Sequence, residues 1–312
     1  MRKTLVLTAI AAVCIALVFI AHTTIVKRNS PVSEKWCWCF KTFFYCSPVV
    51  AGDMVYVAYS TSRGYGENCL YAINRDSGEL EWEYCEDDAE YFSSPSVADG
   101  VVYTRRMGKY SDDRDYLYAV DAANGTMRWR FELGDVLGEI CASPTVVEGI
   151  VYVKSTDTLL YAVDAQNGEL LWQFETEEFI RSSAPAAANG VVCITTDNYL
   201  YAIDTQSGEL NWQYMIRCSP RELSLTVADD AVYMVTIEGR FNSIDKGRLY
   251  AIDIVSGEKR WEYECEVYGE LLVIDAPPSV VDGMVFLGAT HIDGDFGEYV
   301  YFGVMCGSHE LC

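Results

Sequence analysis

A short phrase that alternates apolar and polar residues recurs five times along the chain. Each copy begins with Leu-Tyr-Ala, continues through Asp or Asn to a Gly, and ends on a Trp that follows the Tyr by 11 residues. The alternation predicts two β-strands, and the Gly between them supplies the positive φ that a tight hairpin requires. The five copies are residues 70–82, 117–129, 160–172, 200–212 and 249–261.

A second predicted hairpin lies upstream of this phrase. It consists of two short apolar strands around an acidic residue or Gly, as in residues 47–59, 94–104, 143–153 and 277–289. Two hairpins make a four-stranded antiparallel unit of about 40–50 residues, which is the size of a propeller blade. An open stacked solenoid is the alternative, but four strands per repeat favour closure into a ring. We therefore predict an all-β fold, a β-propeller of four-stranded antiparallel blades.

The chain ends predict how the propeller closes. Residues 277–305 supply three further strands, and no Trp marks a fourth. Near the N-terminus, the segment that starts at Trp38 (Trp-Cys-Phe-Lys-Thr) matches the one that starts at Trp172 (Trp-Gln-Phe-Glu-Thr). An N-terminal strand that completes the last blade would remove two exposed sheet edges. This gives six blades in a domain of residues 31–312, with seven blades or an incomplete ring as alternatives.

The first 30 residues predict a membrane anchor or a signal sequence. Residues Thr4 to Ala21 are 18 positions without a charge, and Arg2 and Lys3 precede them. This length is close to the minimum for a membrane-spanning helix, and no clean small-residue cleavage site follows. We expect a hydrophobic helix that anchors the chain outside the cytoplasmic membrane, or a secreted protein if the segment is cleaved.

The formal charge of −23 excludes some partners. Nucleic-acid affinity depends on Lys and Arg that displace counterions from phosphates, so nucleic acid is not expected as a partner. Direct binding to anionic lipid headgroups is disfavoured for the same reason.

Twelve cysteines suit an oxidising compartment, which agrees with export. Cys69 and Cys85 flank the first copy of the phrase symmetrically, so they lie across from each other if the strands pair in register. A disulfide between them is predicted, with two free thiols as the alternative.

The pattern Ala-x-Asp-x-x-Ser/Asn-Gly-x-x-x-Trp resembles the tryptophan-docking repeat of the pyrroloquinoline quinone (PQQ)-like propeller family. It is fulfilled in four copies, and the first copy departs from it only by Asn74 in place of Asp. The likeness covers about residues 35–305. It implies that each Trp docks one blade onto the next, and we expect this of Trp38, Trp82, Trp129, Trp172, Trp212 and Trp261.

Members of this family are either quinoprotein dehydrogenases or proteins without a cofactor, such as the propeller lipoprotein of outer-membrane barrel assembly. The dehydrogenases are usually about twice this length and hold PQQ beside a disulfide of adjacent cysteines. The sequence has no Cys-Cys pair, and no motif onto which calcium-binding carboxylates or a catalytic base could be mapped. The resemblance therefore favours the non-enzymatic branch and no cofactor. A small PQQ- and calcium-dependent oxidoreductase is the alternative function.

Connection lengths predict where a partner binds. The connection between the second and third strands is long in units one, two, five and six, and short in units three and four. All such connections emerge on one face of a propeller, and loops on a rigid scaffold often carry recognition. We expect a protein or an extracellular polymer to bind this rim, with tolerated surface insertions as the alternative. The candidate residues are Arg63, Tyr65, Lys109, Tyr110, Arg114, Arg240 and Phe241.

One acidic segment is a weak candidate for calcium. His291 is followed by Asp293, Asp295 and Glu298, and carboxylates spaced by two residues can share a calcium ion. A solvated acidic loop is the simpler interpretation. No nucleophile motif and no matched acid–base pair are found, so the sequence predicts a binding or scaffolding protein that is not an enzyme.

Overall fold

The chain divides into two compact units, Met1–Val136 and Leu137–Cys312. The computed structural model describes residues 36–38, 46–59, 68–86, 89–108, 114–135, 142–155, 158–180, 184–216, 224–238, 246–265, 272–273, 277–281, 283–293 and 297–306. Within these ranges, no helix has the length and apolar character needed to span a membrane. The hydrophobic helix predicted within residues 1–30 lies outside the described residues.

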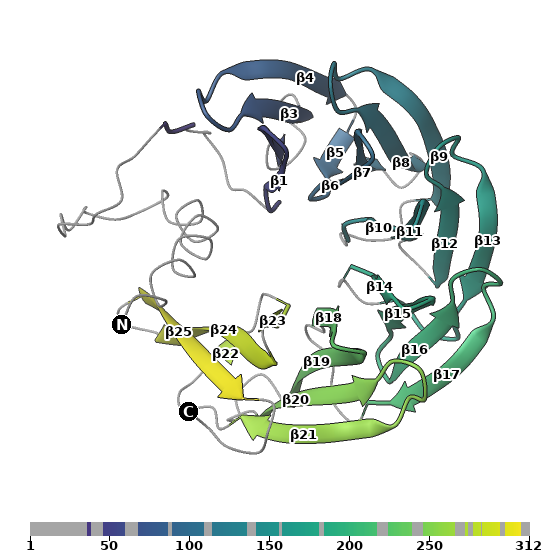
Figure 1. Cartoon of the computed structure of the whole chain (residues 1–312), viewed down its shortest axis with the longest axis vertical. Helices are drawn as coiled ribbons and strands as arrows, with labels where there is room; N and C mark the ends of the chain where they lie inside the picture. The colour runs from purple at the N-terminus through teal and green to yellow at the C-terminus, as the bar shows by residue number, and fades with distance from the viewer. Residues whose placement is uncertain are drawn as a thin grey trace. The chain divides into compact units, whose positions relative to one another are not determined.

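The first unit contains two antiparallel sheets (Figure 1). One has the strand order β1-β2-β3-β4. In the other, β7, β8 and β9 follow one another, and both β5 and β6 pair with β7. The strands are β1 (Val49–Ala51), β2 (Met54–Tyr59), β3 (Asn68–Asn74), β4 (Leu80–Glu86), β5 (Ala89–Phe92), β6 (Ser96–Ala98), β7 (Val101–Gly108), β8 (Arg114–Asp121) and β9 (Met127–Asp135).

The second unit contains four antiparallel sheets. Three have four strands in sequence order: β10 (Thr145–Val147), β11 (Ile150–Lys154), β12 (Leu159–Asp164) and β13 (Leu170–Glu175); β14 (Ala186–Ala188), β15 (Val191–Thr195), β16 (Tyr199–Asp204) and β17 (Leu210–Met215); β18 (Ser224–Ala228), β19 (Ala231–Glu238), β20 (Lys246–Asp253) and β21 (Lys259–Cys265). In the fourth sheet, β24 (Met284–Asp293) pairs with β22 (Leu272–Val273), β23 (Ser279–Val281) and β25 (Gly297–Cys306).

Successive sheets of the second unit meet through one edge strand of each sheet. β14 contacts both β10 and β18, and β18 contacts β23. In Figure 1, β13, β17 and β21 lie at the opposite, outer ends of their sheets. This is the packing of neighbouring blades in a propeller.

The turn inside each repeated phrase is held by its first polar residue. In the first copy, Asn74 Oδ1 accepts hydrogen bonds from the backbone amides of Asp76 and Ser77, both at 3.0 Å. The turn closes with the amide of Gly78 donating to the carbonyl of Asn74 at 2.8 Å, and Gly78 has φ +74°. Asp and Asn side chains favour such local bonds, so Asn74 serves here as the Asp of the other copies does.

The Ala of the phrase makes room for the Trp of the facing strand. Ala72 lies opposite Trp82 in the β3–β4 ladder, and Ala162 lies opposite Trp172 in the β12–β13 ladder. Both alanines are 0% exposed. A larger side chain there would compete with the indole for the same buried face.

The indole rings join neighbouring sheets within each unit. Three rings lie against the turn of the following sheet, and the Nε1 of each donates to the carbonyl of the residue after the Asp of that turn. The donor and acceptor residues are Trp82 and Ala122 (3.0 Å), Trp172 and Thr205 (2.9 Å), and Trp212 and Ile254 (3.0 Å). A Cβ added to the turn glycine would lie 2.7–2.8 Å from the ring at Gly125, Gly208 and Gly257. Only Gly fits under the indole at this distance, since carbon atoms prefer about 3.5–4.0 Å.

Two of the other three predicted docking rings, those of Trp129 and Trp261, make different contacts. The ring of Trp129 lies 5.8 Å from the ring of Tyr103 in its own sheet. The ring of Trp261 lies 5.9 Å from that of Tyr233 and packs against a buried cluster that includes Val285 of the last sheet.

The prediction for the N-terminal docking residue is off by two positions. Trp36 Nε1 donates to the carbonyl of Arg75 at 2.8 Å, and a Cβ on Gly78 would lie 2.6 Å from its ring, so Trp36 takes the place that the sequence assigned to Trp38. Trp38 instead donates to the carbonyl of Gly78 at 2.8 Å. Two residues apart in an extended segment, both rings face the same side, so spacing alone could not separate them. Residues 39–45 of the predicted closing strand lie outside the described residues.

Candidate functional site

Three of the four hairpins that carry long connections are also extended as strands, whereas β2 and β3 of the first have 6 and 7 residues. β7 and β8 have 8 residues each, β19 and β20 have 8 each, and β24 and β25 have 10 each. The corresponding strands with short connections, β11, β12, β15 and β16, have only 5 or 6 residues. Most predicted rim residues lie in the connections themselves, outside the described residues: Arg63, Tyr65, Lys109, Tyr110, Arg240 and Phe241.

A buried ion pair fixes the base of the β7–β8 connection. Arg105 on β7 and Asp115 on β8 are 0% and 1% exposed, and the Arg105 guanidinium bonds to the Asp115 carboxylate. Asp115 also accepts a hydrogen bond from the amide of Gly108 at 3.1 Å, at the last residue before the connection. A buried charge of this kind is strongly destabilising without its partner, so the two side chains hold β7 and β8 together. The rim connection at 109–113 therefore starts from a rigid hairpin.

Arg114, the predicted rim residue that the structure describes, lies at the start of β8. Its guanidinium contacts Glu132 on β9 at 3.1 Å, and its carbonyl accepts a hydrogen bond from Arg106 at 3.0 Å. The Arg114 side chain is 50% exposed, so a partner could reach it.

The weak calcium candidates fall at the tip of the β24–β25 hairpin. Asp293 ends β24 opposite Gly297, and Glu298 lies opposite Ile292 in the ladder. Asp295 lies outside the described residues. Among the residues that the structure describes, no group of three or more His, Cys, Asp and Glu side chains could hold a metal ion.

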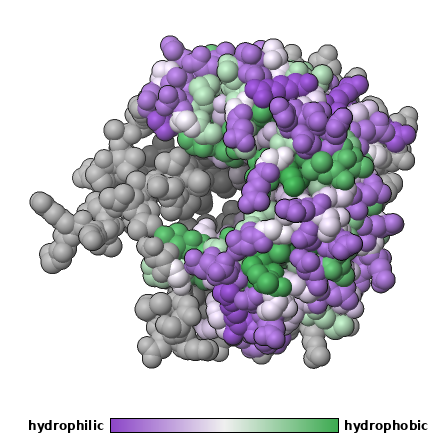
Figure 2. Space-filling view, turned by 45° about the vertical axis from the view of Figure 1, so that its right-hand side comes forward, coloured by the Kyte–Doolittle hydropathy of each residue, from purple (hydrophilic) through white to green (hydrophobic). Residues whose placement is uncertain are grey.

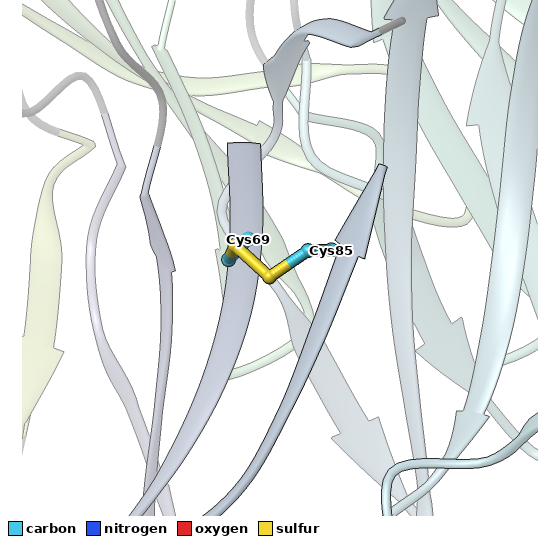
Figure 3. The surroundings of a disulfide bond; sticks show 2 residues. All are labelled: Cys69 and Cys85. Atoms are coloured by element: carbon cyan, nitrogen blue, oxygen red, sulfur yellow. A yellow bond between two sulfur atoms is a disulfide. The ribbon is translucent and has the colours of Figure 1, made fainter. Parts of the chain in front are cut away.

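Cys69 and Cys85 form a disulfide between β3 and β4 (Figure 3). They are directly opposite in the ladder, with an S–S distance of 2.01 Å and a Cα–Cα distance of 4.1 Å. Cys69 is 0% exposed. The bond closes the hairpin at the end where β3 begins, next to the predicted long connection between β2 and β3.

A hollow of about 210 Å³ lies between the sheet β10–β13 and the sheet β14–β17. Aromatic rings of Phe174, Tyr199 and Tyr201 line it, together with Glu175, Glu177 and Gln213, and we call it the tyrosine hollow. Figure 2 shows an outer surface that is mostly hydrophilic with separate hydrophobic patches. The hollow could not be predicted from one repeat, because its lining comes from two repeats at once.

The family model for "Outer membrane protein assembly factor BamB" matches residues 89–293. The chain belongs to the BamB family. No curated protein matches the sequence.

Among solved structures, BamB from Moraxella catarrhalis matches with a TM-score of 0.59 at 16% identity, covering 82% of this chain and 72% of that one. A quinohemoprotein alcohol dehydrogenase, ADHIIG from Pseudomonas putida HK5, matches with a TM-score of 0.54 at 15% identity, covering 78% of this chain and 56% of that one. A europium-containing methanol dehydrogenase matches with a TM-score of 0.56 at 12% identity, covering 83% of this chain and 69% of that one.

At these identities the structural matches show the fold alone. Together with the family match they confirm the β-propeller class of four-stranded antiparallel sheets and the PQQ-like family that the repeated phrase predicted. Both a BamB protein and dehydrogenases share this fold, so the fold by itself does not assign a reaction.

Proposed function

We propose that this BamB-family chain is a non-catalytic scaffold that binds a protein partner on the outer side of the cytoplasmic membrane. The observation that carries the proposal is the family match over residues 89–293, since the matched family is described as an outer membrane protein assembly factor. Residues 1–30 would tether the chain to the membrane or direct its export. N-terminal sequencing of the protein purified from native membranes distinguishes an intact anchor from a cleaved signal.

The partner would bind the rim that the long connections form. Three of the four hairpins that would carry the rim have long strands, and the buried pair of Arg105 and Asp115 holds one of these hairpins in place. Tyr and Arg, the residue types that dominate binding energy at protein interfaces, are present in the connections at Tyr65, Tyr110 and Arg240. A rigid base lowers the entropy lost when a loop binds.

Two loop replacements test this proposal. Residues 109–113 and residues 239–245 are each replaced by a two-residue Asn-Gly turn, which leaves Gly108, Arg114 and the buried ion pair in place. The control replaces residues 156–157 in the short β11–β12 connection. Each variant is used to capture partners from native membranes after crosslinking, with mass spectrometry as the readout.

We expect both rim replacements to lose the protein that the wild type and the control capture. All variants should keep the wild-type urea midpoint, because the strands are unchanged. Capture that survives both replacements would show that the rim is not the site. Capture of an extracellular polymer and of no protein would show that the partner is a polymer.

The second candidate function is a small PQQ- and calcium-dependent oxidoreductase. The structural likeness to two dehydrogenases favours it. The described residues provide no set of carboxylates for calcium, so no residue is assigned to the cofactor. Titration of the purified chain with PQQ and calcium tests this candidate. An absorbance shift together with dye reduction would support it, and the absence of both changes would reject it.

A further inference from the structure

The tyrosine hollow lies at one of three junctions between neighbouring sheets that have the same pair of aromatic positions. Each junction contains an aromatic residue two positions after the docking Trp of one sheet, and the Tyr of the repeated phrase in the next sheet. The ring pairs are Tyr84 and Tyr118 (5.9 Å), Phe174 and Tyr201 (5.9 Å), and Tyr214 and Tyr250 (6.3 Å). The three junctions therefore share one architecture.

In the first of these junctions, an exposed arginine of the chain lies against a tyrosine ring. The guanidinium carbon of Arg130 lies 5.0 Å from the centre of the Tyr116 ring, which is a cation–π distance. A hydrogen bond with Tyr118, and further away the carboxylate of Glu86, raise the pKa of Arg130. Glu86 in turn accepts a hydrogen bond from the Tyr84 hydroxyl at 2.6 Å. A guanidinium thus lies against a tyrosine ring in a junction that also contains a glutamate.

The junction of Tyr214 and Tyr250 also contains an arginine. Arg248 contacts Glu262 at 3.4 Å and Glu264 at 3.6 Å, and its side chain is 25% exposed. Arg248 lies two residues before Tyr250, on the same face of β20. Here again a guanidinium, carboxylates and tyrosines lie together.

The tyrosine hollow has the same surroundings without the arginine. Gln213 follows Trp212 as Arg130 follows Trp129, and Tyr201 lies opposite Gln213 in the ladder as Tyr118 lies opposite Arg130. Tyr199 stands two residues before Tyr201, where Tyr116 and Arg248 stand in the other two junctions. None of the residues that line the hollow is basic. What remains is an aromatic hollow with two glutamates.

The edge of the hollow is fixed and carries negative charge. Glu178 accepts hydrogen bonds from Thr196 Oγ1 at 2.8 Å and from the amide and the side chain of Asn198 at 3.0 and 2.6 Å, which hold the segment that bears Glu177. The pKa of Tyr201 is raised by burial, and further by the charges of Glu178 and Glu177. The hollow is therefore preorganised, and its field favours a cation.

We propose that the tyrosine hollow binds an arginine side chain of a partner protein, with the guanidinium against Tyr199 and Tyr201 and paired to Glu175 or Glu177. A guanidinium fits better than an ammonium because its plane stacks on aromatic rings while its edge bonds to carboxylates. Met215, opposite Tyr199 on the ladder, is 56% exposed and offers apolar contact to the flanking residues of the partner. This site takes no residue from the long connections, so it adds to the proposed function without depending on those loops.

A labelled peptide tests the site on the purified full-length chain. The probe is a short fluorescein-labelled peptide of Gly, Ser and Leu with one central arginine, and its match carries citrulline, which has the same shape without the charge. Binding is followed by fluorescence anisotropy at low ionic strength. We expect the citrulline peptide to bind about tenfold more weakly, because it loses the cation–π contact and the charge-assisted hydrogen bonds.

Two single substitutions locate the binding. Gln213→Arg should place the chain's own guanidinium at the hollow, as Arg130 lies against Tyr116, and should weaken binding of the arginine peptide about tenfold or more. Gln173→Arg adds the same charge one repeat earlier, at an exposed position that also follows a docking Trp, and should leave binding unchanged. Equal binding of the two peptides to the wild type, or unchanged binding to Gln213→Arg, would overturn the proposal. Because no loop is altered, these results are read separately from partner capture at the rim.

Discussion

Replacing Gly125 with Ala should loosen the contact between the two sheets of the first unit far more than the same replacement at Gly100. Both glycines lie in turns of the same sheet, with φ +73° and +72°. An added Cβ meets nothing within 4 Å at Gly100, but at Gly125 it would lie 2.8 Å from the ring of Trp82. The pair therefore separates backbone strain from the close approach of the indole.

The magnitudes follow from these two contributions. An L-residue in the left-handed region is destabilised by about 1–2 kcal/mol, and Gly100→Ala should lose only this much. At Gly125 the ring of Trp82 must also move. Trp82 is 8% exposed and donates to the Ala122 carbonyl, and loss of a buried Trp side chain costs about 3–5 kcal/mol at most. We expect Gly125→Ala to lose about 3–5 kcal/mol in total.

Urea denaturation followed by tryptophan fluorescence measures both variants. A third measurement introduces Gly125→Ala into a Trp82→Ala background, where the clash is absent. In that background, Gly125→Ala should lower the free energy of unfolding only as much as Gly100→Ala does, because the effects of two residues in contact are not additive. Equal losses for the two glycines, or a loss at Gly125 that does not depend on Trp82, would refute the account of docking given above.

Three further predictions concern stability. Asp115→Asn should cost about 3–5 kcal/mol in urea denaturation, because it leaves a buried arginine without its counter-charge; a loss below about 1 kcal/mol would contradict the buried pair. The double variant Cys69→Ser, Cys85→Ser should lose about 3 kcal/mol relative to the oxidised protein, since the bond closes a loop with a separation of 16 residues; equal urea midpoints would argue against the disulfide. The pKa of Asp253 is lowered, first by the hydrogen bond from the Ser256 amide, so its charge stabilises the fold above about pH 3.9 and that contribution is lost as the pH falls further. Asp253→Asn keeps the turn's hydrogen bonds and should flatten the loss of stability below about pH 4; an unchanged acid profile would contradict this.

The repeat itself could be read from the sequence because its signals are local. A Gly with positive φ and a Trp at a fixed spacing determine a hairpin without reference to the rest of the chain. β5 and β22 were not predicted, because their segments pair only with the extended parts of β7 and β24. Phe92 of β5 becomes a core residue only in this packing, 1% exposed and 6.4 Å from the ring of Tyr118.

The candidate sites depended on information that a single repeat does not contain. The tyrosine hollow requires Phe174 of one sheet and Tyr199 of the next. Gln213 stands where three other repeats place the charged residues Glu83, Arg130 and Glu262, but Gln173 also takes this position, so the sequence holds no signal that singles out the hollow. The disulfide was accessible from the sequence, because it depends on one hairpin whose register the repeat defines.

The indoles of Trp36, Trp82, Trp172 and Trp212 each donate a hydrogen bond to a main-chain carbonyl. Their docking therefore does not depend on the side chain of the residue that provides the carbonyl. These residues are Arg75, Ala122, Thr205 and Ile254, and they differ in size, charge and polarity. A duplicated repeat could therefore insert beside any other without a matching change in its neighbour. Such a chain can lengthen or shorten by whole repeats during evolution, while its outward residues diverge to suit new ligands.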